Sequence, residues 1–118
     1  MNPEIKHQII YLEDAFEFLK SLDESARKKV YFNIAKVSIG IQDKAIFKKL
    51  EGTDIWEFRT LYNGKQYRLL AFWDTETNSL IVATHGFVKK TQKTPSKEID
   101  KAEKLKEEYF KNKHNGNK

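Results

Sequence analysis

The sequence contains no cysteine and no long run of apolar residues. Without cysteine it can have no disulfide framework, no thiolate zinc site and no cysteine nucleophile, and this composition fits a reducing cytoplasm. No apolar stretch approaches the ~20 residues that a membrane helix needs, and residues 1–6 lack the apolar segment of a secretory signal. We therefore expect a cytoplasmic protein that does not enter a membrane.

Metal ligands are also scarce in this chain. The only histidines are His7, His85 and His114, which lie far apart in the sequence. No acidic cluster has the spacing of a metal-binding motif. We expect neither a metal site nor a cofactor.

The positive charge is concentrated in one part of the chain. The 118 residues carry a net charge of +5, but residues 1–88 hold 12 basic and 12 acidic side chains. Residues 89–118 hold ten lysines and five acids, so they carry the whole excess. A basic segment beside a neutral body suggests a polyanion partner such as nucleic acid. The alternative interpretation is a solvated helix rich in lysine and glutamate.

Hydrophobic spacing predicts one α+β domain in which helices pack on a small sheet. Asp23 is the expected N-cap of a helix that stops at Gly40, and Thr94 with Pro95 is expected to start the last helix. A polar connection covers residues 42–53. Residues 1–111 form the domain, and residues 112–118 are a basic tail expected to fray. The other expected elements are a strand at 5–11, a helix at 12–22, strands at 55–62, 65–73 and 80–88, and a helix at 96–111.

Asn63-Gly64 between two strand-like segments is a strong hairpin signal and fixes the pairing of the strands. Arg59 then faces Arg68 across the hairpin. Because side chains alternate across a sheet, the pairing also predicts two faces. The core face is expected to hold Trp56, Phe58, Tyr67, Leu69 and Ala71, and the exposed face Glu57, Arg59, Arg68, Leu70 and Phe72.

Two directly opposed arginines destabilise a sheet by up to about 1 kcal/mol, so the pair needs an explanation. One interpretation is an anion site; the other is a structural pair bridged by Glu57, which lies diagonal to Arg68. The next strand places His85, Phe87 and Lys89 on one face and ends at Lys89-Lys90. A cationic cluster with a ring beside it suits a phosphate and a base. Taken alone, a histidine in a strand is more often structural, and two terminal lysines are more often solvated.

Five stretches follow one another in the order of a known family: KLEG at 49–52, IWEFR at 55–59, YRLLAF at 67–72, HGFVKKT at 85–91, and Thr94-Pro95 with Glu98, Ile99 and Ala102. Over residues 5–110 the chain closely resembles the Gp49-like, HigB-type branch of the RelE/ParE toxin superfamily. The resemblance implies a small twisted, antiparallel-rich sheet, with two N-terminal helices packed on one face and a C-terminal helix.

The resemblance also implies a function. Toxins of the RelE and HigB type are basic RNases that cleave mRNA on the ribosome without a metal, and an acidic antitoxin neutralises them. The expected partners are a helix-turn-helix antitoxin, the ribosome and mRNA, with DNA reached only through the antitoxin. Two alternatives are a ParE-like gyrase inhibitor, which would not need opposed arginines, and a non-catalytic basic domain that binds RNA or the ribosome.

Carried over position by position, Arg68 matches a phosphate-contacting arginine, and Arg59, Lys89 and Lys90 match basic positions of the family. Two departures concern proton transfer. Residues 91–98 lack the tyrosine that some relatives carry after the last strand, and His85 is the only histidine near the site. The 2′-OH of RNA would attack the adjacent phosphorus and leave a 2′,3′-cyclic phosphate and a 5′-OH end, which excludes DNA as a substrate.

Each side chain of the expected site has a role that suits its chemistry. Arginine binds two phosphate oxygens at once, whereas histidine, or a lysine crowded by cations, can move protons. The expected catalytic residues are Arg59, Arg68, His85, Lys89 and Lys90, and the expected RNA-binding residues are Lys48, Lys49, Phe72, Phe87 and Lys93.

Overall fold

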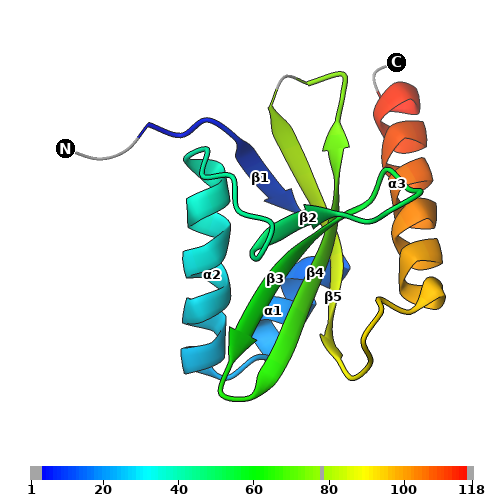
Figure 1. Cartoon of the computed structure of the whole chain (residues 1–118). Helices are drawn as coiled ribbons and strands as arrows, with labels where there is room; N and C mark the ends of the chain where they lie inside the picture. Colours follow the sequence, from blue (N-terminus) through cyan, green and yellow to red (C-terminus); the bar gives the residue numbers. More distant parts are fainter. Residues whose placement is uncertain (1–3, 78, 117–118) are drawn as a thin grey trace.

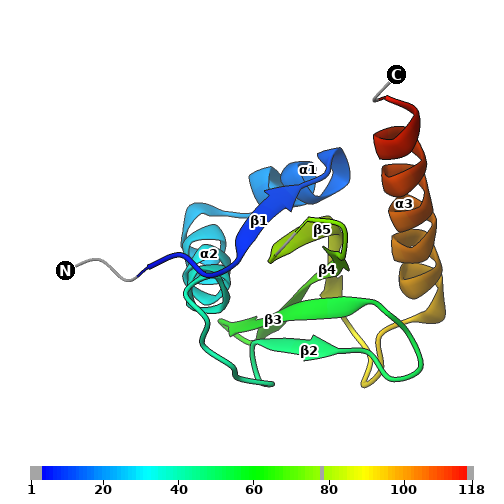
Figure 2. The same cartoon turned by 90° about the horizontal axis from the view of Figure 1, so that it is seen from above.

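Five strands form one mixed sheet with helices on both faces (Figures 1 and 2). The structure is a computed structural model that describes residues 4–77 and 79–116. The strand order is β1-β5-β4-β3-β2, with β1 parallel to β5 and all other neighbours antiparallel. The elements are β1 (Gln8–Tyr11), α1 (Glu13–Ser21), α2 (Glu24–Ser38), β2 (Phe47–Lys49), β3 (Trp56–Tyr62), β4 (Lys65–Asp74), β5 (Leu80–Lys89) and α3 (Ser96–Asn115).

The predicted α+β class and element order are confirmed, with two differences in the elements. The expected polar connection at 42–53 contains the short strand β2, whose pairing with β3 aligns Phe47 with Phe58. The prediction that the chain frays from residue 112 is not met at residues 112–115, which remain helical in α3. Among the described residues, no helix is both long and apolar enough to cross a membrane.

The local signals at the helix ends and the hairpin have mixed outcomes. Asp23 caps α2 by accepting a hydrogen bond from the Ala26 N–H at 2.8 Å, and Gly40 ends the helix region with a φ of +93°. Asn63 and Gly64 both have positive φ, as a two-residue hairpin turn requires. The expected cap of the last helix is wrong, because Pro95 is the N-cap and the Thr94 hydroxyl donates to Glu57 instead.

The sheet separates two hydrophobic cores. The first lies under α1 and α2, where Leu19 and Val30 pack against Phe58 and Leu69. The second lies under α3, where Ala102 covers a layer that includes Leu70 and Phe72. Figure 2 shows α3 standing against the face opposite α2. The predicted exposed face is therefore wrong for Leu70 and Phe72, because α3 covers both and neither is exposed at all.

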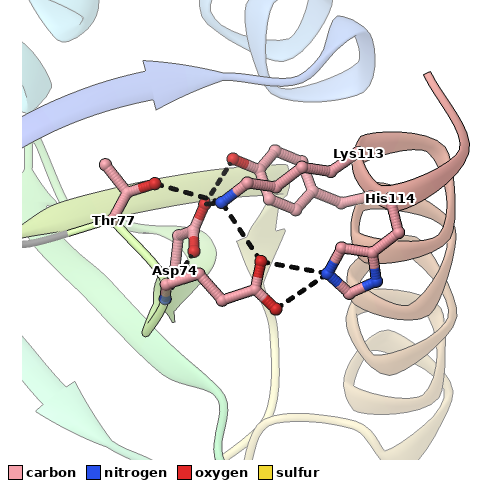
Figure 3. Close-up of polar contacts among 6 residues, drawn as sticks. Asp74, Thr77, Lys113 and His114 are labelled. Atoms are coloured by element: carbon pink, nitrogen blue, oxygen red, sulfur yellow. Dashed lines mark hydrogen bonds and ion pairs between the residues drawn. The ribbon is translucent and has the colours of Figure 1, made fainter. Parts of the chain in front are cut away.

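A cluster of charged and polar side chains fastens the C-terminal end of α3 to the end of β4 (Figure 3). The buried Asp74 carboxylate accepts hydrogen bonds of 2.8 Å from both Lys113 Nζ and Tyr109 Oη. His114 pairs with Glu76 in the following turn at 2.8 Å. Asn78, which lies between the strands predicted at 65–73 and 80–88, is outside the described residues. These contacts help to hold α3 on the second core. The thin apolar stripe of the helix, formed by Ile99, Ala102, Tyr109 and Phe110, would alone dock it weakly.

Close packing of α1 on β5 depends on the missing side chain of Gly86. A Cβ atom at this position would lie 2.6 Å from Cγ of Phe18, so the whole ring would have to move. We expect Gly86→Ala to lower the free energy of unfolding by about 1–3 kcal/mol, the usual cost of overpacking a core. Urea unfolding measures the loss. In a Phe18→Leu background the same change should cost less, and an equal cost in both backgrounds would contradict the role of the ring.

The Asp74 carboxylate should make the stability of the protein sensitive to acid. Burial alone raises its pKa, but hydrogen bonds from Lys113, Tyr109 and the Glu76 N–H outweigh burial and lower the pKa from 3.8 to about 2. Because the folded-state pKa lies below the unfolded value, the stabilisation is complete above about pH 4 and is lost as the pH falls through 2.

We expect Asp74→Asn to lower the free energy of unfolding by about 1–3 kcal/mol at pH 7 and to flatten its fall between about pH 4 and 2. Urea unfolding at a series of pH values measures both effects. Asp100→Asn, at an exposed position of α3, is the control and should leave the curve unchanged. A wild-type pH dependence in Asp74→Asn would contradict this role of the carboxylate.

Candidate functional site

The hairpin places the two arginines opposite each other, as predicted from Asn63-Gly64. Arg59 pairs with Arg68 in the β3–β4 register, and every other predicted cross-strand pair of the hairpin is also present. The two side chains lie on the sheet face that α3 and the chain leading into it partly cover. The site is therefore built between the hairpin, the end of β5 and residues 90–95.

A β-bulge in β5 places His85, Phe87 and Lys89 on the same face of the sheet as the two arginines. His85 lies opposite Leu70, but the next pair along β4 joins Ala71 to Ala83, so Thr84 has no residue opposite it. An extra residue reverses the alternation of side chains along a strand. Ala83 consequently packs in the first core, whereas His85, Phe87 and Lys89 lie on the arginine face.

A single carboxylate bridges the opposed arginines. Oε1 of Glu57 lies 3.5 Å from Nε of Arg59 and 3.5 Å from Nε of Arg68. Oε2 of Glu57 accepts a 2.7 Å hydrogen bond from the hydroxyl of Thr94. The Glu57 bridge, one of the two interpretations of the pair, is therefore present in the structure. Two guanidinium groups against one carboxylate still leave a net positive charge.

The two arginines differ in their access to solvent. The side chain of Arg68 is 4% exposed, and its guanidinium also donates to Gln66 Oε1 and to the carbonyl of Tyr67. The expectation that Arg68 lies on an exposed face is wrong, because the whole residue is only 3% exposed. Arg59 is 29% exposed and is the arginine that reaches the surface.

Burial and neighbouring charge shift the pKa values of the cations in the site. Burial lowers the pKa of Arg68, an effect that Glu57 opposes and Arg59 reinforces. Burial also lowers the pKa of Lys89; Arg68, Arg59 and Lys48 lower it further, whereas Glu57 opposes them. The ammonium group of Lys89 therefore gives up its proton more readily than that of an ordinary lysine.

Two neighbouring grooves meet at Arg59, Lys89 and Gln92, which line both of them. The larger groove, of about 970 Å³, continues along the hairpin end and includes Lys90. We call the smaller one, of about 450 Å³, the Glu57 groove; its lining residues also include Lys48, Glu57, Lys93, Thr94 and Ile99. Four of the predicted site lysines thus gather around Arg59.

Three of the remaining predicted residues lie elsewhere or under cover. Lys49 aligns with Trp56 on the other side of the sheet and lines neither groove. Phe72 is fully buried against Tyr109, so a base cannot stack on it in this conformation. Phe87 is half-buried, with its ring centroid 6.3 Å from that of His85.

His85 has the surroundings of a structural histidine. Its side chain is 3% exposed, with Nε2 placed 3.1 Å from Oε1 of Glu98 and Nδ1 placed 3.1 Å from Oγ1 of Thr84. Burial lowers its pKa below 6.5, although the hydrogen bond with Glu98 opposes this shift. His85 lines neither groove. Among the described residues, no group of three histidine or acidic side chains could hold a metal ion.

Three of the six lysines of the last helix pair with carboxylates of the domain. Lys101 pairs with Asp14 at 3.2 Å, Lys106 with Asp54 at 3.5 Å, and Lys113 with Asp74 at 2.8 Å. These pairs support the interpretation of α3 as a helix rich in lysine and glutamate, and they draw part of its charge toward the domain. Four lysines of the predicted site lie around Arg59.

The sequence did not reveal the contributions of Thr94, Gln66 and Glu98. Thr94 and Glu98 act through contacts with residues distant in sequence. Gln66 contacts Arg68 two positions further along the same strand. None of the three belongs to a local motif. The only signal in the sequence is that two opposed arginines need a negative counter-charge, which Glu57 can supply. The position of Thr94 before a proline instead predicts that it caps the last helix.

Comparison with known families decides the relationship. Residues 17–107 match the model of the phage-derived protein Gp49-like family. The chain belongs to this family. Among solved structures, the free state of an arginine-to-alanine double mutant of E. coli toxin RelE is similar, with a TM-score of 0.62 and 19% sequence identity. The match covers 85% of this chain and 97% of that chain. A search of curated proteins finds no match.

Both findings confirm the predicted assignment to the RelE superfamily. At this identity the structural match establishes the fold, and the family model establishes the Gp49-like branch. The mixed sheet between two N-terminal helices and a C-terminal helix is therefore the RelE fold.

The Glu57 bridge generates a prediction about stability. Glu57→Gln keeps an acceptor for Thr94 but leaves the buried guanidinium of Arg68 without a counter-charge. Removing one partner of a buried ion pair costs about 3–5 kcal/mol, and we expect a loss of that order in urea unfolding. The double change Glu57→Gln with Arg68→Met should recover much of the loss, because no uncompensated buried cation remains. Equal stability of Glu57→Gln and the wild type would contradict the bridge.

Proposed function

We propose that this chain is the toxin of a type II toxin–antitoxin system and a metal-independent, ribosome-dependent mRNA endonuclease. The observation that carries the proposal is the groove pair that meets at Arg59 and Lys89, with Arg68 and Glu57 behind it. Membership of the Gp49-like family and the RelE fold support the toxin class. The proposed partners are an antitoxin of the helix-turn-helix type, the ribosome and mRNA, all in the cytoplasm, with DNA reached only through the antitoxin.

The arginines supply the charge that phosphate cleavage needs. A scissile phosphate at the junction of the grooves would meet the partly exposed guanidinium of Arg59. The planar fork of an arginine can bind two phosphate oxygens. Arg68 lies directly behind Arg59 in the low-dielectric interior and adds positive potential without touching solvent. Glu57 forms a 3.5 Å ion pair with each guanidinium group and so acts as a positioning residue. Charge fixed in advance stabilises the pentavalent phosphorus of the transition state.

Lys89 is the residue best placed to move the first proton. Its lowered pKa gives a larger neutral fraction, and the neutral amine can take the proton of the 2′-OH. The 2′ oxygen then forms a bond to phosphorus as the bond from phosphorus to the 5′ oxygen breaks. The leaving 5′ oxygen takes a proton from Lys90 or from water, which gives the 2′,3′-cyclic phosphate and the 5′-OH end.

His85 does not receive a step in this mechanism. Its ring is enclosed by Thr84, Glu98 and α3, so a phosphate at Arg59 has no direct path to it in this conformation. Lys48 and Lys93 line the Glu57 groove and are proposed to bind the phosphates that flank the cleavage point. Phe87, half-buried beside this region, remains the proposed stacking ring.

The test is the chemistry of the cleaved ends. Wild-type protein added to a translating extract should yield mRNA fragments with 2′,3′-cyclic phosphate and 5′-OH ends, detected by end-specific ligation. Lys89→Ala should lower the rate by about 10²–10⁴, the usual contribution of a positioned base. Arg59→Ala should lower it by about 10²–10³ through lost charge stabilisation. Lys28→Ala, at an exposed site on α2, is the matched control and should cleave normally.

The pH dependence of the rate separates the two roles. Because the pKa of Lys89 lies below its ordinary 10.5, the rate should rise with pH as the amine loses its proton. Lys89→Ala should lose this rise, whereas Arg59→Ala should keep it at a lower rate. No cleavage despite ribosome binding would replace the proposal with a non-catalytic RNA-binding domain. Fragments without cyclic phosphate ends would instead overturn the proposed attack by the 2′-OH.

A further inference from the structure

A second cavity lies on the opposite face of the sheet from the arginines. It encloses about 480 Å³ between the C-terminal end of α2, residues 40–44 and strands β2 to β4. Its walls include Phe47, Trp56 and Trp73, and these two tryptophans are the only ones in the chain. None of these residues takes part in the mechanism proposed for the arginine face.

The rings of this cavity form an apolar wall that remains partly open to solvent. Phe47 stacks on Trp56 with centroids 4.9 Å apart, and Trp73 meets Trp56 edge-on at 6.3 Å. All three rings are only half-buried, and Ile41 at the rim is 44% exposed. Half-exposed tryptophans in a pocket are typical of the anchor positions that supply most of the energy of a protein interface. The cavity therefore suits an apolar side chain from another protein.

More lysines than acidic residues lie on and around the rim of the cavity. Lys44 lines it, and the stem of Lys6 covers Gly40, where a Cβ atom would lie 2.7 Å from Lys6 Cδ. One turn back along α2, the ammonium of Lys36 lies 4.7 Å from the centre of the exposed Phe32 ring. Asp43 also lines the cavity, and its carboxylate accepts a 2.9 Å hydrogen bond from the Ala45 N–H. This distribution favours a partner segment rich in acidic residues.

We propose that this cavity is the docking site for the antitoxin, which inserts an aromatic or branched aliphatic side chain from an acidic segment. The identity of the partner rests on the proposed function. The location of its binding site rests on the cavity and the charges around it. RNA binding at this face is an outcome that the test below can detect.

One loop connects this cavity to the arginine face. Residues Asp43 and Lys44 line the cavity, and the carbonyl of Lys44 accepts a 3.3 Å hydrogen bond from Nη1 of Arg59. The carbonyl of Ile46 accepts a 2.8 Å hydrogen bond from the Arg59 N–H. A partner that shifts this loop would thus change the position of Arg59 without entering the groove. Docking at the tryptophans therefore provides a route to inhibition from the far side of the sheet.

The experiment measures binding of the full chain to its co-expressed antitoxin, the small protein encoded beside it, by titration at equilibrium. The double variant Ile41→Asp with Lys44→Glu should raise Kd by at least about 30-fold, the effect of losing one anchor contact together with charge complementarity. The matched control is Phe16→Asp with Lys20→Glu on α1, where Phe16 is 50% exposed and Lys20 lies 5.5 Å from its ring. This control makes the same changes in charge and should leave Kd unchanged.

A spectroscopic readout places the contact independently of affinity. With 5-fluorotryptophan incorporated only into this chain, both ¹⁹F resonances should shift on antitoxin binding, because both tryptophans line the cavity. A complex that forms with unshifted resonances, or with unchanged Kd in the double variant, would overturn the proposal. Loss of binding in Lys89→Ala together with Lys93→Ala, but not in the cavity variant, would place the antitoxin in the groove instead. Shifts produced by single-stranded RNA alone would identify a nucleic-acid surface.

Failure of docking and failure of the proposed function give different results. Absence of any complex overturns the docking site, while the cyclic phosphate ends still decide the endonuclease separately. Conversely, a complex that depends on Ile41 and Lys44 would support the docking site even if no mRNA were cleaved. The protein would then be an inactive toxin relative that still binds its antitoxin.

Discussion

The contact on which this site depends is the one between Glu57 and the two arginines. Two guanidinium groups on neighbouring strands repel each other, and the buried Arg68 would carry an uncompensated charge without a carboxylate at 3.5 Å. The second oxygen of Glu57 also binds Thr94, which fixes the chain that leads into α3. The same carboxylate thus joins three segments: β3, β4 and residues 90–95. The grooves exist because these segments are held together there.

Short-range signals in the sequence were sufficient to predict the hairpin and both ends of α2. Asn63-Gly64 fixed the β3–β4 register residue by residue, since a two-residue turn allows only one pairing. Asp23 and Gly40 mark the limits of α2 because a cap and a left-handed residue act within one turn of the helix. These features depend on neighbours a few residues away, which is why one sequence contains enough information to predict them.

Features that depend on distant segments were not predictable in this way. The bulge at Thr84 decides which face receives His85 and Lys89, but the stretch from Leu80 to Val88 has too few polar residues to show a change of alternation. The burial of Arg68 and Phe72 follows from where α3 lies, and a thin apolar stripe does not reveal how much surface its helix covers. The length of α3 depends in turn on the buried Asp74, whose partners come from nearly forty residues away.

The two edges of the sheet have a consequence for how other chains can approach it. One edge is β1 with four residues, and the other is β2 with three, two of which are Lys48 and Lys49. Short edges that carry lysine offer few free backbone groups in a row and resist pairing with a strand of another molecule. The protein should therefore remain dispersed at concentrations at which a longer apolar edge would aggregate, and its sheet should not be extended by a partner. Recognition is left to side chains in the grooves and the tryptophan cavity, where specificity can be tuned one residue at a time.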